Sequence, residues 1–460
     1  MENFWEFSVW VVFNLVSALL FSLLMANVLK KSMRWLNDSL IPTSVLGGII
    51  LLIISAIYKA ATGNVFFDSD FFGGNGTNNL EIITYHTLAL GFIASALKTS
   101  ESKINKQRSI EIFNTGVTTV STYLIQGVVG MGITIIATYF FIDNFFEASG
   151  LLLPFGYGQG TGQALNYGNI YETQFGFSGG RSFGLTIAAL GFLSASLGGV
   201  IHLNILKKLK KIKNTAVHEG TLDSEQIQGE NEIPMHGSMD KLTVQLALVA
   251  AGYFITYTLM YLLGLLLPGM RSVIIGFNFL LGVISASLIK LVLKFCGKKK
   301  IIKKQYANNF LLTRISNFFF DVMVVAGIAA IRLDMLERYW GVILILGVTG
   351  LVITYAYNRF VAKKLFPDYC EEQFLMMYGM LTGTASTGVI LLREIDGHFK
   401  TPAADNLVYQ NFPAIVFGFP LMLLATLAPV KPILTLIILF LFFVVMNLIL
   451  FRSFIFKRKK

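Results

Sequence analysis

Long runs of apolar side chains recur along almost the whole chain, and they constrain its fold more than any other feature. A helix needs about 20 mainly apolar residues to cross a hydrocarbon core about 30 Å thick. Runs of this kind lie at 5–28, 42–60, 84–98, 110–142, 180–206, 242–267, 272–294, 311–331, 339–361, 404–428 and 433–455. These eleven runs predict an all-α polytopic membrane protein with about 11 transmembrane helices.

The composition supports a membrane protein over a soluble one. The 460 residues are 54% hydrophobic and 14% charged, whereas a soluble domain has about 25% charged residues. A net charge of +11 suggests a nucleic-acid partner in a soluble protein, but here the basic residues stand in short clusters between apolar runs. Cys296 and Cys370 lie far apart and give neither a disulfide framework nor zinc spacing. We therefore expect no nucleic-acid partner, no metal, no cofactor and no enzymatic activity.

The distribution of lysine and arginine predicts the orientation of the helices. These residues concentrate in cytoplasmic loops, and with the N-terminus outside most of the 37 fall on the inner side. The outside loops then hold only Lys59, Arg181, Arg271, Arg332, Arg338 and Lys431. Residues 1–4 include no basic side chain, so the first run is predicted to be a retained helix and not a cleaved signal peptide. The C-terminus is predicted to be cytoplasmic.

Two further segments, 150–172 and 374–395, are apolar but rich in glycine and small hydroxyl residues. Such segments suit re-entrant hairpins, because irregular backbone is tolerated at membrane depth only where protein or a water-filled cavity covers it. The stretches 157–164 and 378–385 share Tyr, Gly, Thr, Gly and Ala in register. Interrupted segments at matching positions of two halves indicate the central site of a transporter, although close packing of small residues is an alternative explanation.

These patterns divide the chain into two inverted five-helix repeats, each with one re-entrant hairpin. The predicted parts are a first repeat at 1–206, a cytoplasmic linker at 207–241, a second repeat at 242–428, and an extra transmembrane helix with a basic tail at 429–460. The part of the linker at 219–232 is acidic and predicted to be flexible.

A broken helix frees backbone amides for a carboxylate and backbone carbonyls for a dehydrated cation. The residues predicted to bind the substrate are Gln159, Gly160, Thr161, Gly162, Gln163, Asn166, Gly383, Thr384 and Arg393. Among these, Arg393 has two interpretations: it clamps a carboxylate with two hydrogen bonds, or it extends to the cytoplasmic interface.

Oxygen atoms and ionisable groups at membrane depth suggest a site for sodium. The residues predicted to hold the ion are Thr382, Ser386, Thr387, Gln126 and Asp321. Each has an ordinary structural alternative. Hydroxyl groups commonly bond back to their own helix, and a buried glutamine often bonds to a neighbouring helix. Asp321 is a functional candidate because it is ionisable within a predicted span.

Several motifs resemble the bacterial sodium:glutamate symporter family. They are Ser44-Val45-Leu46-Gly47-Gly48, the Gln126-containing run 124–132, and 158–164 followed by 171–177. The resemblance implies sodium-coupled symport of glutamate in a bacterial cytoplasmic membrane, by an elevator-type movement in a homodimer. Gln159 stands where histidine is usual in the family, and the second hairpin lacks proline. Another anionic or zwitterionic substrate, other ion coupling, a channel and a ligand sensor are the alternatives.

Overall fold

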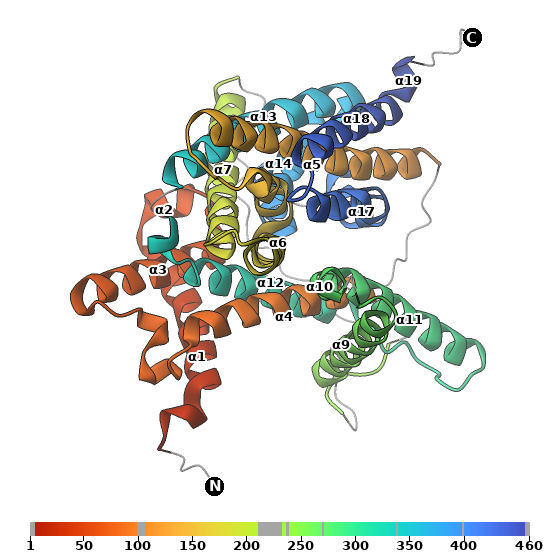
Figure 1. The fold of residues 1–460 in the computed structure, drawn as a ribbon. Helices are drawn as coiled ribbons and strands as arrows, with labels where there is room; N and C mark the ends of the chain where they lie inside the picture. The colour runs from red at the N-terminus through yellow and green to blue at the C-terminus, as the bar shows by residue number, and fades with distance from the viewer. Residues whose placement is uncertain are drawn as a thin grey trace. The chain divides into compact units, whose positions relative to one another are not determined.

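The computed structural model describes residues 5–98, 106–209, 232–235, 239–268, 271–336, 339–397 and 400–455 (Figure 1). Within these residues the chain is helical, and the β-structure found there is one isolated bridge between Glu232 and Gln305. Of the predicted acidic stretch 219–232, only Glu232 lies within the described residues.

Ten helices in the described part of the chain are long and apolar enough to cross a membrane. They are α1 (Phe7–Ser32), α3 (Thr43–Thr62), α4 (Gly76–Leu97), α5 (Lys106–Phe140), α7 (Gly180–Lys208), α9 (Lys241–Leu266), α11 (Asn278–Lys298), α12 (Asn309–Ala329), α13 (Trp340–Leu365) and α18 (Pro432–Leu450). Many of them expose large apolar side chains, such as Phe21 on α1, Phe254 on α9 and Phe440 on α18. Soluble proteins bury such surfaces, so the chain is a multi-pass membrane protein.

The remaining elements are shorter. They are α2 (Arg34–Asp38), η1 (Phe66–Asp68), η2 (Asp70–Phe72), η3 (Glu147–Leu151), η4 (Pro154–Gly158), α6 (Gln159–Phe175), α10 (Arg271–Gly276), η6 (Leu333–Leu336), η7 (Pro367–Tyr369), α14 (Cys370–Thr382), α15 (Ala385–Arg393), α16 (Ala403–Tyr409), α17 (Asn411–Leu427) and α19 (Arg452–Ile455).

The helix expected at 404–428 differs from the prediction, because it is divided into α16 and α17. Pro413 has no amide to donate to the carbonyl of Tyr409, and its ring crowds that carbonyl. The apolar helix that follows, 413–427, is too short to count among the ten.

The helix expected at 84–98 begins earlier, at Gly76. The carboxylate of Asp68 accepts a hydrogen bond from the amide of Thr77 at 2.9 Å. A side-chain acceptor at a helix start satisfies an amide that has no partner within the helix. The polar stretch before residue 84 is therefore helical although it is not apolar.

The chain forms two compact units that cut across the predicted halves. Unit 1 comprises Met1–Glu81, Ile104–Val217 and Val324–Lys460, and unit 2 comprises Ile82–Lys103 and His218–Met323. Within unit 2, Ile93 of α4 packs against two glycines: a methyl group built on Gly252 or Gly282 would come within 2.9 Å of its side chain. Small residues let the helices approach closely there.

In unit 1, α5 lies beside α13 and α18 (Figure 1), and α7 packs against α6, α13 and α14. Several of these contacts join backbone to backbone. A methyl group on Gly150 would lie 2.2 Å from the carbonyl of Gly130, and one on Gly184 would lie 2.4 Å from that of Ala164. Unit 1 contains both of the glycine-rich segments.

Candidate functional site

The first glycine-rich segment is a helical hairpin with a break at Gly160. Its first limb is η4, which is π-helical, and its second limb is α6. Gly160 has φ 78° and ψ −172°, a conformation that is essentially restricted to glycine. The ring of Phe155 stacks on that of Tyr167, with centroids 3.9 Å apart and planes 6° apart. The two limbs therefore fold back against each other.

The second glycine-rich segment is also a hairpin, with its break at Gly383 and Thr384. These residues separate α14 from α15. A methyl group built on Gly379 would lie 2.9 Å from Cα of Gly388. The two helices thus approach at backbone distance, which only residues without a side chain permit.

The two breaks lie against each other. A methyl group built on Gly160 would be 3.4 Å from Cγ2 of Thr384 and 3.6 Å from the carbonyl oxygen of Gly383. The sequence separation is more than 220 residues, so one turn from each predicted half contributes to the same place. We call the residues at and beside these two turns the break cluster.

Helix α5 supplies a hydrogen-bond donor to each break. Tyr123 Oη donates to the carbonyl of Gly158 at 3.1 Å. Gln126 Nε2, one turn further along, donates to the carbonyl of Leu381 at 3.0 Å and to Thr354 Oγ1 at 2.8 Å. Carbonyls at the end of a helix lack intrahelical donors, so α5 satisfies one such group on each hairpin.

Gln163 in α6 is the clearest sign of a ligand. Its side chain is 1% exposed, and neither Nε2 nor Oε1 has a hydrogen-bond partner. Gln126 Oε1 is also buried without a partner. Leaving such a group unsatisfied costs about 1–3 kcal/mol, and a native structure accepts this cost rarely. The amide of Gln163 can donate to and accept from a polar ligand.

Other predicted substrate residues surround the first break. Thr161, Gly162 and Asn166 are buried, and Gln159 is partly exposed. Thr161 packs against α12, since a methyl group on Gly327 would lie 2.8 Å from its Cβ. The structure therefore brings Gly160 of this group against Gly383 and Thr384 of the second break, and the other residues of 159–166 directly precede or follow Gly160 along α6.

The predicted cation residues have mixed placements. Thr382 Oγ1 donates to the carbonyl of Tyr378 at 2.6 Å, which is the ordinary back-bonded arrangement. The hydroxyls of Thr384 and Thr387 lie 3.4 Å apart at the second break. The side chain of Ser386 lies outside the described residues.

One predicted substrate residue lies away from the break cluster. Arg393 is the last residue of α15, at the opposite end of that helix from Thr384, and it is exposed. Nine helical residues span about 13 Å, so this position favours the interpretation that Arg393 extends to the interface. Asp321 lies in α12, in the part of that helix that belongs to unit 2, and its role as an ion ligand stays a prediction.

Sequence reasoning missed the role of two tyrosines. Tyr157 and Tyr378 are fully buried, and both reach Ser194 of α7. Tyr157 Oη lies 2.9 Å from Ser194 Oγ, and Tyr378 Oη donates to the carbonyl of Ser194 at 2.8 Å. They are the paired tyrosines of the two matching stretches, so the internal similarity was the signal that could have found them.

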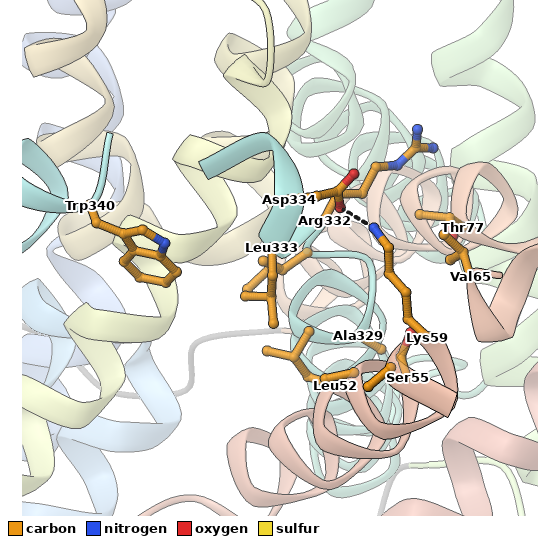
Figure 2. Close-up of a pocket in the computed structure, with 13 residues that line it drawn as sticks. Leu52, Ser55, Lys59, Val65, Thr77, Ala329, Arg332, Leu333, Asp334 and Trp340 are labelled. Atoms are coloured by element: carbon orange, nitrogen blue, oxygen red, sulfur yellow. Dashed lines mark ion pairs between the residues drawn. The ribbon is translucent and has the colours of Figure 1, made fainter. Parts of the chain in front are cut away.

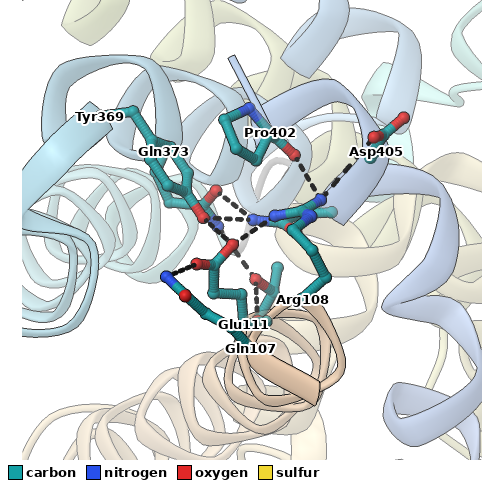
Figure 3. A network of polar contacts seen from close by, with 9 residues as sticks. Gln107, Arg108, Glu111, Tyr369, Gln373, Pro402 and Asp405 are labelled. Atoms are coloured by element: carbon teal, nitrogen blue, oxygen red, sulfur yellow. Dashed lines mark hydrogen bonds and ion pairs between the residues drawn. The ribbon is translucent and has the colours of Figure 1, made fainter. Parts of the chain in front are cut away.

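A second polar network joins the start of α5 to the starts of α14 and α16 (Figure 3). Glu111 accepts hydrogen bonds from Arg108 and, at 2.9 Å, from Tyr369 Oη. Arg108 also lies 3.8 Å from Asp405. Gln373 donates to Thr115 Oγ1 at 3.1 Å. This network contains two of the three charged residues of α5, Arg108 and Glu111, whereas the α5 residues beside the breaks are uncharged.

No protein-family model and no curated protein matches this chain. The break cluster is therefore the main indication of function.

Proposed function

We propose that the chain is a secondary active transporter that carries glutamate or a related anionic or amino-acid substrate together with sodium. The observation that carries this proposal is the contact of the two helix breaks beside Gln163, whose amide is buried without a partner. Broken helices that meet within a membrane protein are the usual setting of a transporter's substrate and ion sites.

The chemistry of the break cluster suits this cargo. Backbone amides near Gly160 bind a carboxylate, and the amide of Gln163 provides one more donor and one acceptor. Backbone carbonyls at the second break and the hydroxyls of Thr384 and Thr387 suit a hard cation. Coupling arises if sodium binds the substrate-loaded protein more tightly than the empty one. The substrate then binds the sodium-loaded protein more tightly by the same factor.

The order of elements supports the predicted duplication. Four long helices precede each hairpin and a further helix follows it, with α18 outside both sets. With the lysine and arginine distribution, we propose two inverted repeats, an N-terminus outside and a bacterial cytoplasmic membrane. An elevator-type movement in a homodimer, implied by the resemblance to sodium:glutamate symporters, belongs to the same proposal.

The second candidate is a transporter of another carboxylate or amino acid with different ion coupling. It is favoured by the position of Arg393, since the described residues of the break cluster then include no cationic side chain for a second carboxylate. A channel is a weaker alternative, because two paired breaks form a closed contact and not a continuous pore.

Purified protein in liposomes tests the proposal by uptake of labelled glutamate with and without an inward sodium gradient. We expect uptake to require the gradient and Gln163→Ala to lower it about tenfold, which matches the loss of one buried hydrogen-bonding group. Asn169→Ala, at an exposed position of the same helix, is the matched control and should leave uptake unchanged.

Three other results would change or reject the proposal. Uptake that ignores sodium would reject the coupling. Counterflow of other acids in place of glutamate would support the second candidate. Single-channel currents from the purified protein would reject a transporter.

A further inference from the structure

A cavity of about 430 Å³ lies in unit 1, and none of the residues that line it is at either helix break (Figure 2). It is bordered by the second half of α3, the segment around the start of α4, the residues that follow α12, and Trp340 at the start of α13. Sites for small molecules have volumes of about 300–1,000 Å³. The predicted orientation places this cavity at the outer side of the membrane.

The cavity carries two cations and one anion. Lys59 Nζ and Asp334 Oδ1 form an ion pair at 3.0 Å (Figure 2). Arg332 also lines the cavity, and among the described residues its guanidinium makes no hydrogen bond or ion pair. The nearby carboxylate of Glu81 is paired with Arg181 at 2.7 Å and attracts the charge of Arg332 at longer range. The described lining therefore has two cations and one anion, and Arg332 forms no close ion pair there.

Two buried donors in this lining have no acceptor. Arg332 Nε is buried without a partner, and so is Thr77 Oγ1, whose residue is 2% exposed. A buried donor without an acceptor is costly, and a guanidinium binds carboxylates with particular geometric fit. Both groups indicate an anionic ligand with oxygen acceptors.

The rest of the lining is apolar and includes Leu52, Val65, Leu333 and Trp340. Small-molecule sites of this type combine a mainly apolar wall with a few polar groups that fix orientation. We infer that the cavity is a binding site for a small monocarboxylate with an apolar body, held by Arg332 and Thr77 and modulated by the Lys59–Asp334 pair. The inference does not depend on the proposed transport function.

Trp340 provides the reporter for a test on the full chain. Trp5, Trp10 and Trp35 are replaced by phenylalanine, and the protein is placed in nanodiscs of phosphatidylcholine. The probe is 6-bromohexanoate, whose bromine quenches tryptophan fluorescence, with 6-bromohexanol as the uncharged control. We expect saturable quenching by the acid and at least about tenfold weaker quenching by the alcohol.

Three substitutions then test the assignment. Arg332→Gln should weaken binding about tenfold. Asp334→Asn should strengthen it, because Lys59 is released toward the ligand and the lining gains one positive charge. Lys431→Gln, at an exposed lysine on the same predicted side that does not line the cavity, should change nothing. A thermal unfolding curve for each variant identifies loss of folding.

Arg332→Gln and Asp334→Asn are expected to change the affinity in opposite directions, so one of them still tests the site if the other unfolds. Equal quenching by acid and alcohol would overturn it, as would unchanged affinity in both Arg332→Gln and Asp334→Asn. Loss of quenching when the nanodiscs contain phosphatidylglycerol would assign the site to a lipid headgroup and overturn the soluble ligand.

Discussion

The two helix breaks meet at one place but are built differently. The first depends on a glycine-only backbone conformation at Gly160, and residues 151–168 around it are buried except for Gln159, which is partly exposed. The second has no positive φ angle at Gly383 or Thr384, and Thr384 and Ala385 are at least partly exposed. The comparison teaches that close contact does not require equal rigidity. The first break is fixed by its backbone, and the second is held mainly by side chains.

The most direct test of this difference in rigidity is to add one methyl group to each turn. Gly160→Ala should lower stability by about 3 kcal/mol, because alanine is strained at that φ and ψ. Gly383→Ala should cost about 1 kcal/mol, since its methyl group would meet side-chain atoms of Thr387 and Phe192 at 2.9 and 3.0 Å. Apparent melting temperatures in detergent measure both. Equal shifts would contradict the difference in rigidity.

The donors on α5 give a smaller and more local test. Gln126→Leu leaves the carbonyl of Leu381 and the hydroxyl of Thr354 without this fully buried donor, at a cost of about 2 kcal/mol. Tyr123→Phe removes one bond from a partly exposed residue, at about 1 kcal/mol. Hydrogen exchange should rise at 378–388 in the first variant and at 156–162 in the second. A uniform rise in both variants would mean that α5 does not act on the two breaks separately.

Acid should loosen the end of the second hairpin through Asp396, and this is the smallest expected effect. Asp396, just after α15, accepts bonds from the amides of Lys400 and Thr401 and from Thr401 Oγ1. Burial raises the pKa of Asp396, but the bonds from Thr401 and Lys400 lower it more, so the net pKa lies below its ordinary value.

A lowered pKa in the folded state stabilises the protein above the ordinary aspartate pKa of about 3.9, and this stabilisation is lost as the pH falls through the folded-state value. Hydrogen exchange at 385–397 should therefore rise between pH 5 and pH 3, taken as an approximate window. Asp396→Asn should remove that pH dependence. The first hairpin has its own carboxylate, Glu172, which accepts a bond from the amide of Arg181 at 3.1 Å. Asp396→Asn should therefore leave the exchange at 161–175 unchanged, and an equal effect of this variant on both hairpins would contradict the assignment.

Most of the fold could be predicted from apolar run length, because crossing a bilayer sets helix length directly. The errors have local causes. Pro413 divides an apolar run that looks continuous, and Asp68 extends α4 into a polar stretch. The compact units could not be predicted, since they depend on which helices pack together and not on the order of the chain.

The site was predictable where backbone chemistry defines it. Glycine and hydroxyl residues indicated both breaks, and Gln126 and Gln163 were selected for their amides. The two interpretations of Arg393 could not be separated from sequence, because its distance from the break depends on the intervening residues forming the continuous helix α15. Tyr123 was missed since a tyrosine within an apolar run carries no sign of its partner. That the side-chain amide of Gln163 is buried without a hydrogen-bond partner can be found only from the structure.

The two α5 donors lie three residues apart on a single rigid rod. A shift of that helix along its axis would withdraw the hydroxyl and the amide from their carbonyls together. Both hairpins would then lose these hydrogen bonds in a single event.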